Sequence, residues 1–452
     1  MRAYSHVVIM ATDGQQIDTL GSPDRARVGL LPPRPHVRGS SLVETPGDPP
    51  NAVPDRSRWG RLHVLDWIAI GLAAVGLVCV LTGLLPRADA EGTMRRIIPI
   101  LIFLGTVVVL AELTAVAGVF DALATRVAVT ARGSFRALFW LCVGFASVTT
   151  IALNLDTTAV LLTPVMIALA RALNVPPTPL AMTTVWLANT ASLLLPVSNL
   201  TNILASDRVD LDPVPWAARM WWPQLVAVAV TALLLWWWYW RPARAGADPF
   251  DPPPPYVPPD RVLYRTALAA CLLFVAGILA GVEIGVASGV AAAILVAGFA
   301  VRARHRLRLA LVPWRLLVFV TGLFLVVQTI GRYGLDSVMG TLIGTDPGAE
   351  GALRAGAVGA LFSNAVNNLP AYLAGEAVIA ADRHTQLLAL LIGTNVGPLA
   401  TPWASLATLI WYERCRAAGV AVPLGRFVAT SAALAVLATT ATVTALLVGP
   451  GA

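Results

Sequence analysis

Polar side chains interrupt long apolar segments at four places in this sequence. Residues 154–158 read NLDTT and residues 363–368 read SNAVNN, whereas residues 195–207 read LPVSNLTNILASD and residues 391–411 read LIGTNVGPLATPWASLATLIW. Amide and hydroxyl groups donate and accept hydrogen bonds, and a broken helix exposes backbone groups with partial charges at its cut ends. Together these groups can hold a polar solute or an ion inside a membrane protein.

The candidate solute- or ion-binding residues are the amides, hydroxyls and one carboxylate of these stretches. They are Asn154, Asp156, Thr157, Thr158, Ser198, Asn199, Thr201, Asn202, Ser363, Asn364, Asn367, Asn368, Thr394, Asn395, Thr401 and Ser405. The candidate structural helix breaks are Pro196, Gly397, Pro398 and Pro402. One such residue in a membrane helix is more often a kink or a helix–helix contact, but four interruptions in matching order favour a transport site.

Asp156 is the only acid at the tip of a polar stretch. An ionisable side chain at membrane depth costs free energy and usually serves a function. We therefore predict that Asp156 binds the coupling ion or proton. The alternative is a structural aspartate that caps the helix after it.

The composition requires a membrane for these elements. Hydrophobic residues make up 57% of the chain, charged residues only 13%, and the mean hydropathy is +0.73. A soluble domain carries roughly 25% charged residues, and a bilayer-spanning helix needs about 20 apolar residues. Many windows of that length occur here, so the sequence predicts an all-α polytopic protein of the cell membrane.

Other function classes find little support in the residues. All 32 basic residues are arginine, and the net charge of +7 is better explained by loops that orient the helices than by a nucleic-acid surface. The four cysteines are dispersed and form no CxxC pair. Because HExxH, GxSxG and P-loop patterns are absent from the sequence, we expect no enzyme, no metal and no cofactor.

The apolar pattern predicts nine full spans after a disordered cytoplasmic tail at residues 1–62. The spans cover approximately 64–85, 97–119, 179–206, 218–240, 263–281, 283–301, 310–330, 385–409 and 425–449. Two further segments, 137–173 and 352–380, are too long and too interrupted to be single spans. Non-helical backbone at membrane depth is tolerated only where protein or water covers it, so both are predicted to be re-entrant helical hairpins.

Arginine placement predicts the topology. With the N-terminus inside, 24 arginines fall on the inner side and 8 on the outer side, as inner loops favour. The first hairpin then enters from inside and the second from outside. We therefore predict an inverted repeat, residues 63–240 and 263–452, joined by a proline-rich cytoplasmic linker at 241–262. The helices at 179–206 and 385–409 would be the broken helix of each repeat.

Four motifs resemble a known family. These are LPVSNLTNILASD at 195–207, VPWRLLVFVTGLFLVV at 312–327, NNLP at 367–370 and GPLATPWASLATLIW at 397–411. They are similar to the arsenical pump membrane proteins, which are arsenite and antimonite permeases of the ion transporter superfamily. The resemblance implies efflux of arsenite or antimonite, two hairpins, two broken helices, a homodimer and elevator-like alternating access.

The chain departs from that family at Asn189 and Asn395, where the family carries aspartates. Uncharged arsenite needs hydrogen-bonding partners more than an opposite charge, and amides supply them. The alternative is a sodium- or proton-coupled transporter of inorganic or carboxylate anions in the same superfamily. Because the chain has no ATP-binding motif, a gradient of H⁺ or Na⁺, or a separate ATPase subunit, would have to drive transport.

Overall fold

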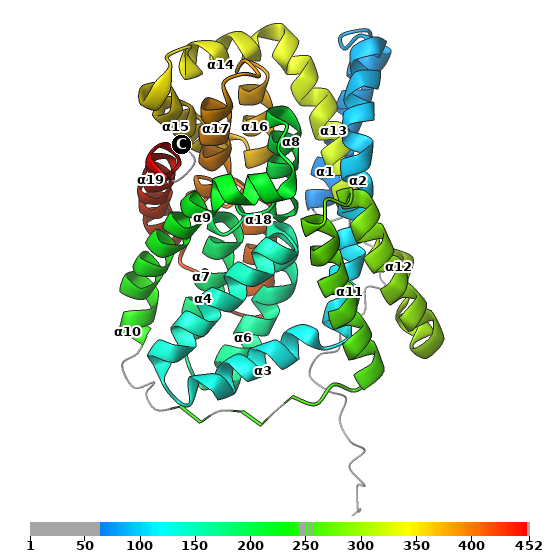
Figure 1. Cartoon of the computed structure of the whole chain (residues 1–452), viewed down its shortest axis with the longest axis vertical. Coiled ribbons are helices and arrows are strands. Elements are labelled where there is room, and N and C mark those ends of the chain that lie inside the picture. Colours follow the sequence, from blue (N-terminus) through cyan, green and yellow to red (C-terminus); the bar gives the residue numbers. More distant parts are fainter. Residues whose placement is uncertain (1–63, 244–249, 252, 255, 450–452) are drawn as a thin grey trace, which may run out of the picture. The chain divides into compact units, whose positions relative to one another are not determined.

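The computed structural model describes residues 64–243, 250–251, 253–254 and 256–449. The predicted tail at 1–62 and part of the predicted linker lie outside these residues. The described residues form helices and connecting segments without a strand, which confirms the all-α fold class (Figure 1).

The first half of the chain carries ten α-helices among its described residues. They are α1 (Val64–Leu81), α2 (Arg87–Val116), α3 (Val119–Ala131), α4 (Phe135–Ala152), α5 (Leu155–Thr157), α6 (Thr163–Ala172), α7 (Pro177–Thr190), α8 (Leu200–Val209), α9 (Pro213–Leu235) and α10 (Arg241–Ala243). Two π-helical turns, η1 (Thr158–Leu162) and η3 (Trp236–Trp240), and a 3₁₀ turn, η2 (Pro196–Ser198), complete this half.

The second half repeats much of this succession. Its helices are α11 (Arg261–Leu279), α12 (Ile284–Arg302), α13 (Trp314–Ile330), α14 (Asp336–Ile343), α15 (Gly348–Ala365), α16 (Asn368–Glu376), α17 (His384–Val396), α18 (Leu406–Ala417) and α19 (Leu424–Val448). Short turns η4 (Arg304–Arg306), η5 (Leu309–Leu311) and η6 (Gly331–Leu335) connect three of them.

Eight described helices are long and apolar enough to cross a membrane. Six of them match predicted spans, namely α2, α9, α11, α12, α13 and α19. The other two are α4 and the continuous helix of α5, η1 and α6, which are the arms of the predicted first hairpin. The predicted spans at 179–206 and 385–409 are not among the eight, because each consists of two shorter helices with a gap between them.

Helix contacts follow the same order in the two halves. Helix α3 packs against both α4 and α6, and α14 packs against both α15 and α16. Helix α1 packs against α13, whereas α2 packs against α12. Helices α7 and α9 are in contact, as are α17 and α19. Figure 1 shows α8, α16 and α17 toward one end of the described unit and α3, α4 and α6 toward the other.

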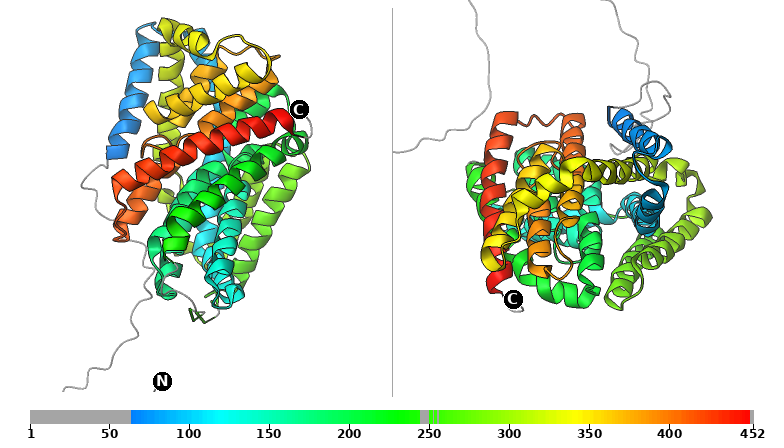
Figure 2. Two further views of the ribbon diagram at one scale, coloured as in Figure 1. Left: turned by 90° about the vertical axis from the view of Figure 1, so that its left-hand side faces the viewer. Right: turned by 90° about the horizontal axis from the view of Figure 1, so that it is seen from above.

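Close backbone approaches allow this packing. A Cβ atom on Gly393 of α17 would collide with the backbone of Gly356 in α15, and one on Gly322 of α13 would collide with the backbone of Ala73 in α1. Small residues at helix contacts are the usual way in which membrane helices pack closely. Helices α9 and α19 also run side by side (Figure 2).

Two large apolar cores result. One contains the hairpins, the broken helices, α9 and α19, and the other lies between α2, α11 and α12. Outside the spans, Asp260 caps α11 and accepts a hydrogen bond from Arg302 at 2.7 Å. This hydrogen bond lowers the pKa of Asp260 and joins the N-terminal end of α11 to the C-terminal end of α12.

Candidate functional site

An asparagine with unusual backbone geometry occupies each hairpin tip. Asn154, before α5, has φ 146° and ψ 172°, and Asn367, before α16, has φ 155° and ψ 158°. Residues other than glycine rarely adopt this region, and doing so costs about 1–3 kcal/mol. Each side chain compensates by capping the next helix, since Asn154 accepts from the Thr157 amide at 2.8 Å and Asn367 from the Leu369 amide at 3.3 Å.

Both broken helices restart on a capping residue. Helix α7 ends at Thr190, and Asn199 then caps α8 by accepting from the Thr201 amide at 3.3 Å. Helix α17 ends at Val396, and Ser405 caps α18 by accepting from the Thr408 amide at 3.1 Å. The positively polarised N-termini of α8 and α18 therefore lie within the buried core.

The predicted breaking residues lie in or beside these gaps. Pro196 begins the 3₁₀ turn η2, and α7 has already ended at Thr190 because Asn189 and Thr190 are followed by non-helical backbone. Gly397 is the capping residue at the end of α17, and Pro398 and Pro402 follow within the second gap.

The most informative hydrogen bonds cross between the two halves. Asn395, at the end of α17, donates to Asn202 Oδ1 of α8 at 2.7 Å and accepts from the Thr201 hydroxyl at 2.6 Å. Asn189, at the end of α7, donates to Thr408 Oγ1 of α18 at 3.5 Å. Asn202 and Thr408 are each the third residue after a cap, so the two contacts correspond.

The first gap is held by side chains on three elements. Asn202 donates to the carbonyls of Ser192 and Leu195 at 2.6 and 2.9 Å. Gln224 of α9 accepts from the amide of Leu193 at 2.7 Å. Ser198 donates to the Ile151 carbonyl at the end of α4 at 2.9 Å, which joins the gap to the first hairpin.

The second gap is held mainly by the second hairpin. Asn364 donates to the Gly397 carbonyl at 2.7 Å and accepts from the amides of Ala400 and Thr401 at 2.9 and 3.2 Å. The Thr401 hydroxyl returns a hydrogen bond to the Asn364 carbonyl at 2.9 Å. Asn367 donates to the Trp403 carbonyl at 2.9 Å. Their geometry gives Asn364, Asn367 and Thr401 structural work in this conformation.

Other predicted residues use their polar atoms within their own elements. The hydroxyls of Thr158, Ser363 and Thr394 donate to carbonyls one turn earlier in the chain. The Asn368 amide donates to the Ala404 carbonyl at 2.8 Å, which ties the start of α16 to the second gap.

Four buried polar atoms around the first hairpin and the breaks have no hydrogen-bond partner among the described residues. They are Ser147 Oγ, Thr157 Oγ1, Asn189 Oδ1 and Asn199 Nδ2. Buried polar groups are nearly always paired with protein, water or a ligand, so unpaired ones mark where a polar molecule fits. Helix α5, which carries Thr157, packs against both α7 and α18 and so brings the first hairpin tip beside two broken helices.

Asp156 lies on the same short helix α5 and is half-buried. No hydrogen bond or ion pair joins its side chain to another described residue. The described residues also contain no group of three or more His, Cys, Asp or Glu side chains that could hold a metal ion.

Three residues with a clear part in this arrangement are missing from the predicted set. Gln224, Asn189 and Thr408 contribute as much as most predicted residues. Asn189 and Thr408 stand in the two broken segments, and their spacing to the next cap would have identified them. Gln224 was signalled only by being a polar side chain beside Pro223 in an apolar span.

A family model described as a citrate transporter matches residues 61–408. The chain belongs to the citrate transporter family. Members of a transporter family with eight membrane-length helices are multi-pass proteins, and this chain is accordingly a secondary transporter of the cell membrane.

Relatives in the citrate transporter family are named for arsenic. The chain is 30% identical to the arsenical pump membrane protein of Yersinia enterocolitica over 331 residues, which cover 68% of this chain and 76% of that protein. It is 29% identical to the arsenical pump membrane protein of Escherichia coli K12, with the same coverage. The putative arsenical pump membrane protein of Bacillus subtilis is 22% identical and covers 73% of this chain, with 82% of its own length matched. The resemblance predicted from the four motifs is confirmed.

A solved structure is also similar. The YdaH transporter of Alcanivorax borkumensis matches with a TM-score of 0.49 and 16% identity, covering 85% of this chain and 96% of its own. The family assignment rests on the sequence matches, because a TM-score below 0.5 adds no weight to it.

We predict that the crossing hydrogen bond couples Thr201 to Asn395. Thr201→Val and Asn395→Ala both remove it, so the double variant should lose less stability than the sum of the single losses, by about 0.5–3 kcal/mol. Denaturant unfolding of the four proteins measures this difference. Combining Thr201→Val with Thr321→Val, whose hydroxyl bonds within α13, should be additive. Strict additivity of Thr201→Val and Asn395→Ala would contradict the contact.

Proposed function

We propose that this transporter carries arsenite or antimonite out of the cell through a site at the hairpin tips and helix breaks. The unpaired buried atoms of Thr157, Asn189 and Asn199 are the observation that supports this function. They are a hydroxyl, an amide oxygen and an amide nitrogen, and none is a cation. An uncharged trihydroxide can donate to the first two and accept from the third.

The names of the relatives agree with this substrate. Because Asn189 and Asn395 are amides, the site offers hydrogen bonds without a fixed negative charge, which suits a neutral solute better than an ion. The paired breaks would bind it from both halves, since Asn395 already reaches α8 and Asn189 reaches α18. Of the predicted residues, Asn199 and Thr157 would bind the solute, while Asn364 and Thr401 would hold the second gap.

A second candidate function is transport of a small carboxylate or inorganic anion. The description of the family as citrate transporters favours it. The N-termini of α8 and α18 would then supply positive partial charge to the anion in place of a side chain.

We propose further that residues 63–240 and 263–452 form an inverted repeat about this site. The matching contacts support it, because α1 with α13 and α12 with α2 are the pairs that a two-fold relation would exchange. Re-entrant entry of both hairpins, a homodimer and an inner N-terminus belong to the same proposal. Asp156 would carry the coupling H⁺ or bind Na⁺, and a separate ATPase subunit is the alternative source of energy.

Cells that lack their own arsenite pump should become resistant when they express this chain. Asn199→Ser keeps an oxygen to cap α8 but removes the unpaired amide nitrogen, and Thr157→Val removes the unpaired hydroxyl at similar volume. Both should lower arsenite efflux at least tenfold at unchanged expression and thermal stability. Thr321→Val is the matched control and should transport normally. Absence of rescue by the wild type would refute arsenite as the substrate.

Asp156→Asn tests the coupling role separately. If Asp156 carries the proton or binds sodium, the variant should lose the dependence of transport on the pH or sodium gradient while still binding solute. Transport by proteoliposomes with imposed gradients measures this. A gradient dependence equal to that of the wild type would remove Asp156 from coupling.

A further inference from the structure

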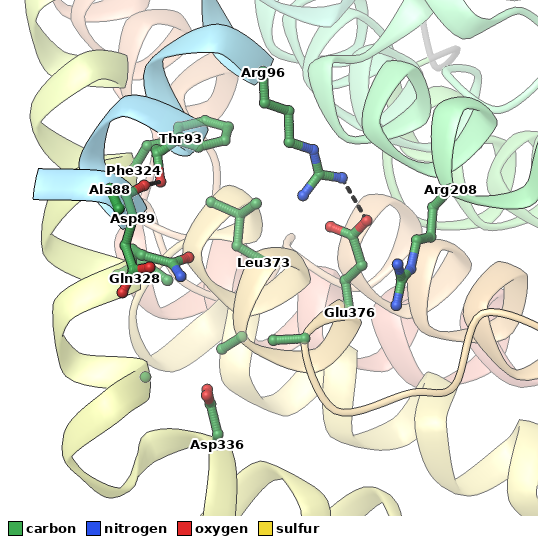
Figure 3. Close-up of a pocket in the computed structure, with 15 residues that line it drawn as sticks. Ala88, Asp89, Thr93, Arg96, Arg208, Phe324, Gln328, Asp336, Leu373 and Glu376 are labelled. Atoms are coloured by element: carbon green, nitrogen blue, oxygen red, sulfur yellow. Dashed lines mark hydrogen bonds and ion pairs between the residues drawn. The ribbon is translucent and has the colours of Figure 1, made fainter. Parts of the chain in front are cut away.

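A pocket of about 420 Å³ lies away from the helix breaks, between α2, α8, α13 and α16 (Figure 3). Its lining includes Thr93, Arg96, Arg208, Gln328, Leu373 and Glu376. None of these residues belongs to the predicted site. The volume falls within the range of roughly 300–1,000 Å³ typical of small-molecule sites.

One end of the pocket is basic. Glu376, whose side chain is only 4% exposed, accepts a hydrogen bond from Arg96 Nη2 at 2.6 Å. Figure 3 shows Arg208 on the opposite side of Glu376 from Arg96. No hydrogen bond or ion pair joins Arg208 to another described residue. Two guanidinium groups around one carboxylate leave one uncompensated positive charge at this end.

The opposite end does not cancel that charge at the guanidinium groups. Asp89 is neutralised by an ion pair with Arg332 at 2.6 Å. Asp336 lies on the far side of the pocket from Arg96 in Figure 3. Between the two ends, Leu373 offers apolar surface and Gln328 an exposed amide, so a ligand with a carbon skeleton fits better than a bare ion.

We propose that this pocket is a second binding site, which takes a small carboxylate anion. Arg208 would form the charge-assisted, two-point contact that guanidinium groups make with carboxylates. Arg96 would contribute when its contact with Glu376 adjusts, and the side chain of Gln328 would bind a second polar group. The site joins α2 to the half-helix after the first break and to the second arm of the second hairpin.

Calorimetry with citrate as the probe tests this site on the purified full-length protein in lipid nanodiscs. The wild type should bind citrate, and Arg208→Gln should weaken binding at least tenfold, because it removes the free guanidinium. Arg95→Gln changes the adjacent residue of α2, which does not line the pocket, and should bind as the wild type. Wild-type protein that does not bind citrate, or Arg208→Gln protein that binds equally well, would overturn the proposal.

Glu376→Gln gives a change in the opposite direction, which misfolding would not produce. The amide still accepts from Arg96, but the like charge beside the ligand is gone, so citrate should bind several-fold more tightly. Weaker binding by this variant would also overturn the proposal. Because calorimetry needs no transport, failure of arsenite efflux in cells would leave this result readable.

Discussion

Backbone N–H and C=O groups at the two helix breaks must find partners inside a protein that is otherwise apolar. An unpaired backbone group in an apolar environment costs several kcal/mol, and no water is available in the core of a bilayer to relieve this. The side chains around the breaks meet this demand. Asn202 and Gln224 bond the first gap, and Asn364 bonds the second. Many polar residues in these apolar segments are thus explained by the irregular backbone beside them.

The same requirement connects the two halves. Each first half-helix ends in an asparagine that reaches the opposite half, Asn395 toward Asn202 and Asn189 toward Thr408. Neither break is therefore complete within its own half of the chain. Atoms left over after this pairing, such as Asn199 Nδ2, are the ones available to a solute.

Charge is distributed differently. Amides and hydroxyls dominate at the breaks, whereas guanidinium and carboxylate groups gather in the pocket between α2, α8 and α16. Burying an unpaired charge costs far more than burying an amide, which explains why most ion pairs of the described residues lie near helix ends. The peripheral pocket and the central site therefore suit different chemistry in the same molecule.

Much of this arrangement could be predicted from the sequence. Apolar length and the interruptions at 154–158, 195–207, 363–368 and 391–411 located the helices, the hairpin arms and both gaps, because those signals are local. Partner choice is not local. Nothing in the sequence separates Asn364, which is used to hold a gap, from Asn199, which keeps a free amide nitrogen, because the distinction depends on which elements meet.

Anomalous scattering from antimony would test the central claim most directly, because the element itself locates the solute. In an experimental structure of the protein with antimonite, the account predicts a peak at the breaks, within hydrogen-bonding reach of Asn199 and Thr157. A peak elsewhere, or none at saturating antimonite, would contradict the claim that the paired breaks form the transport site.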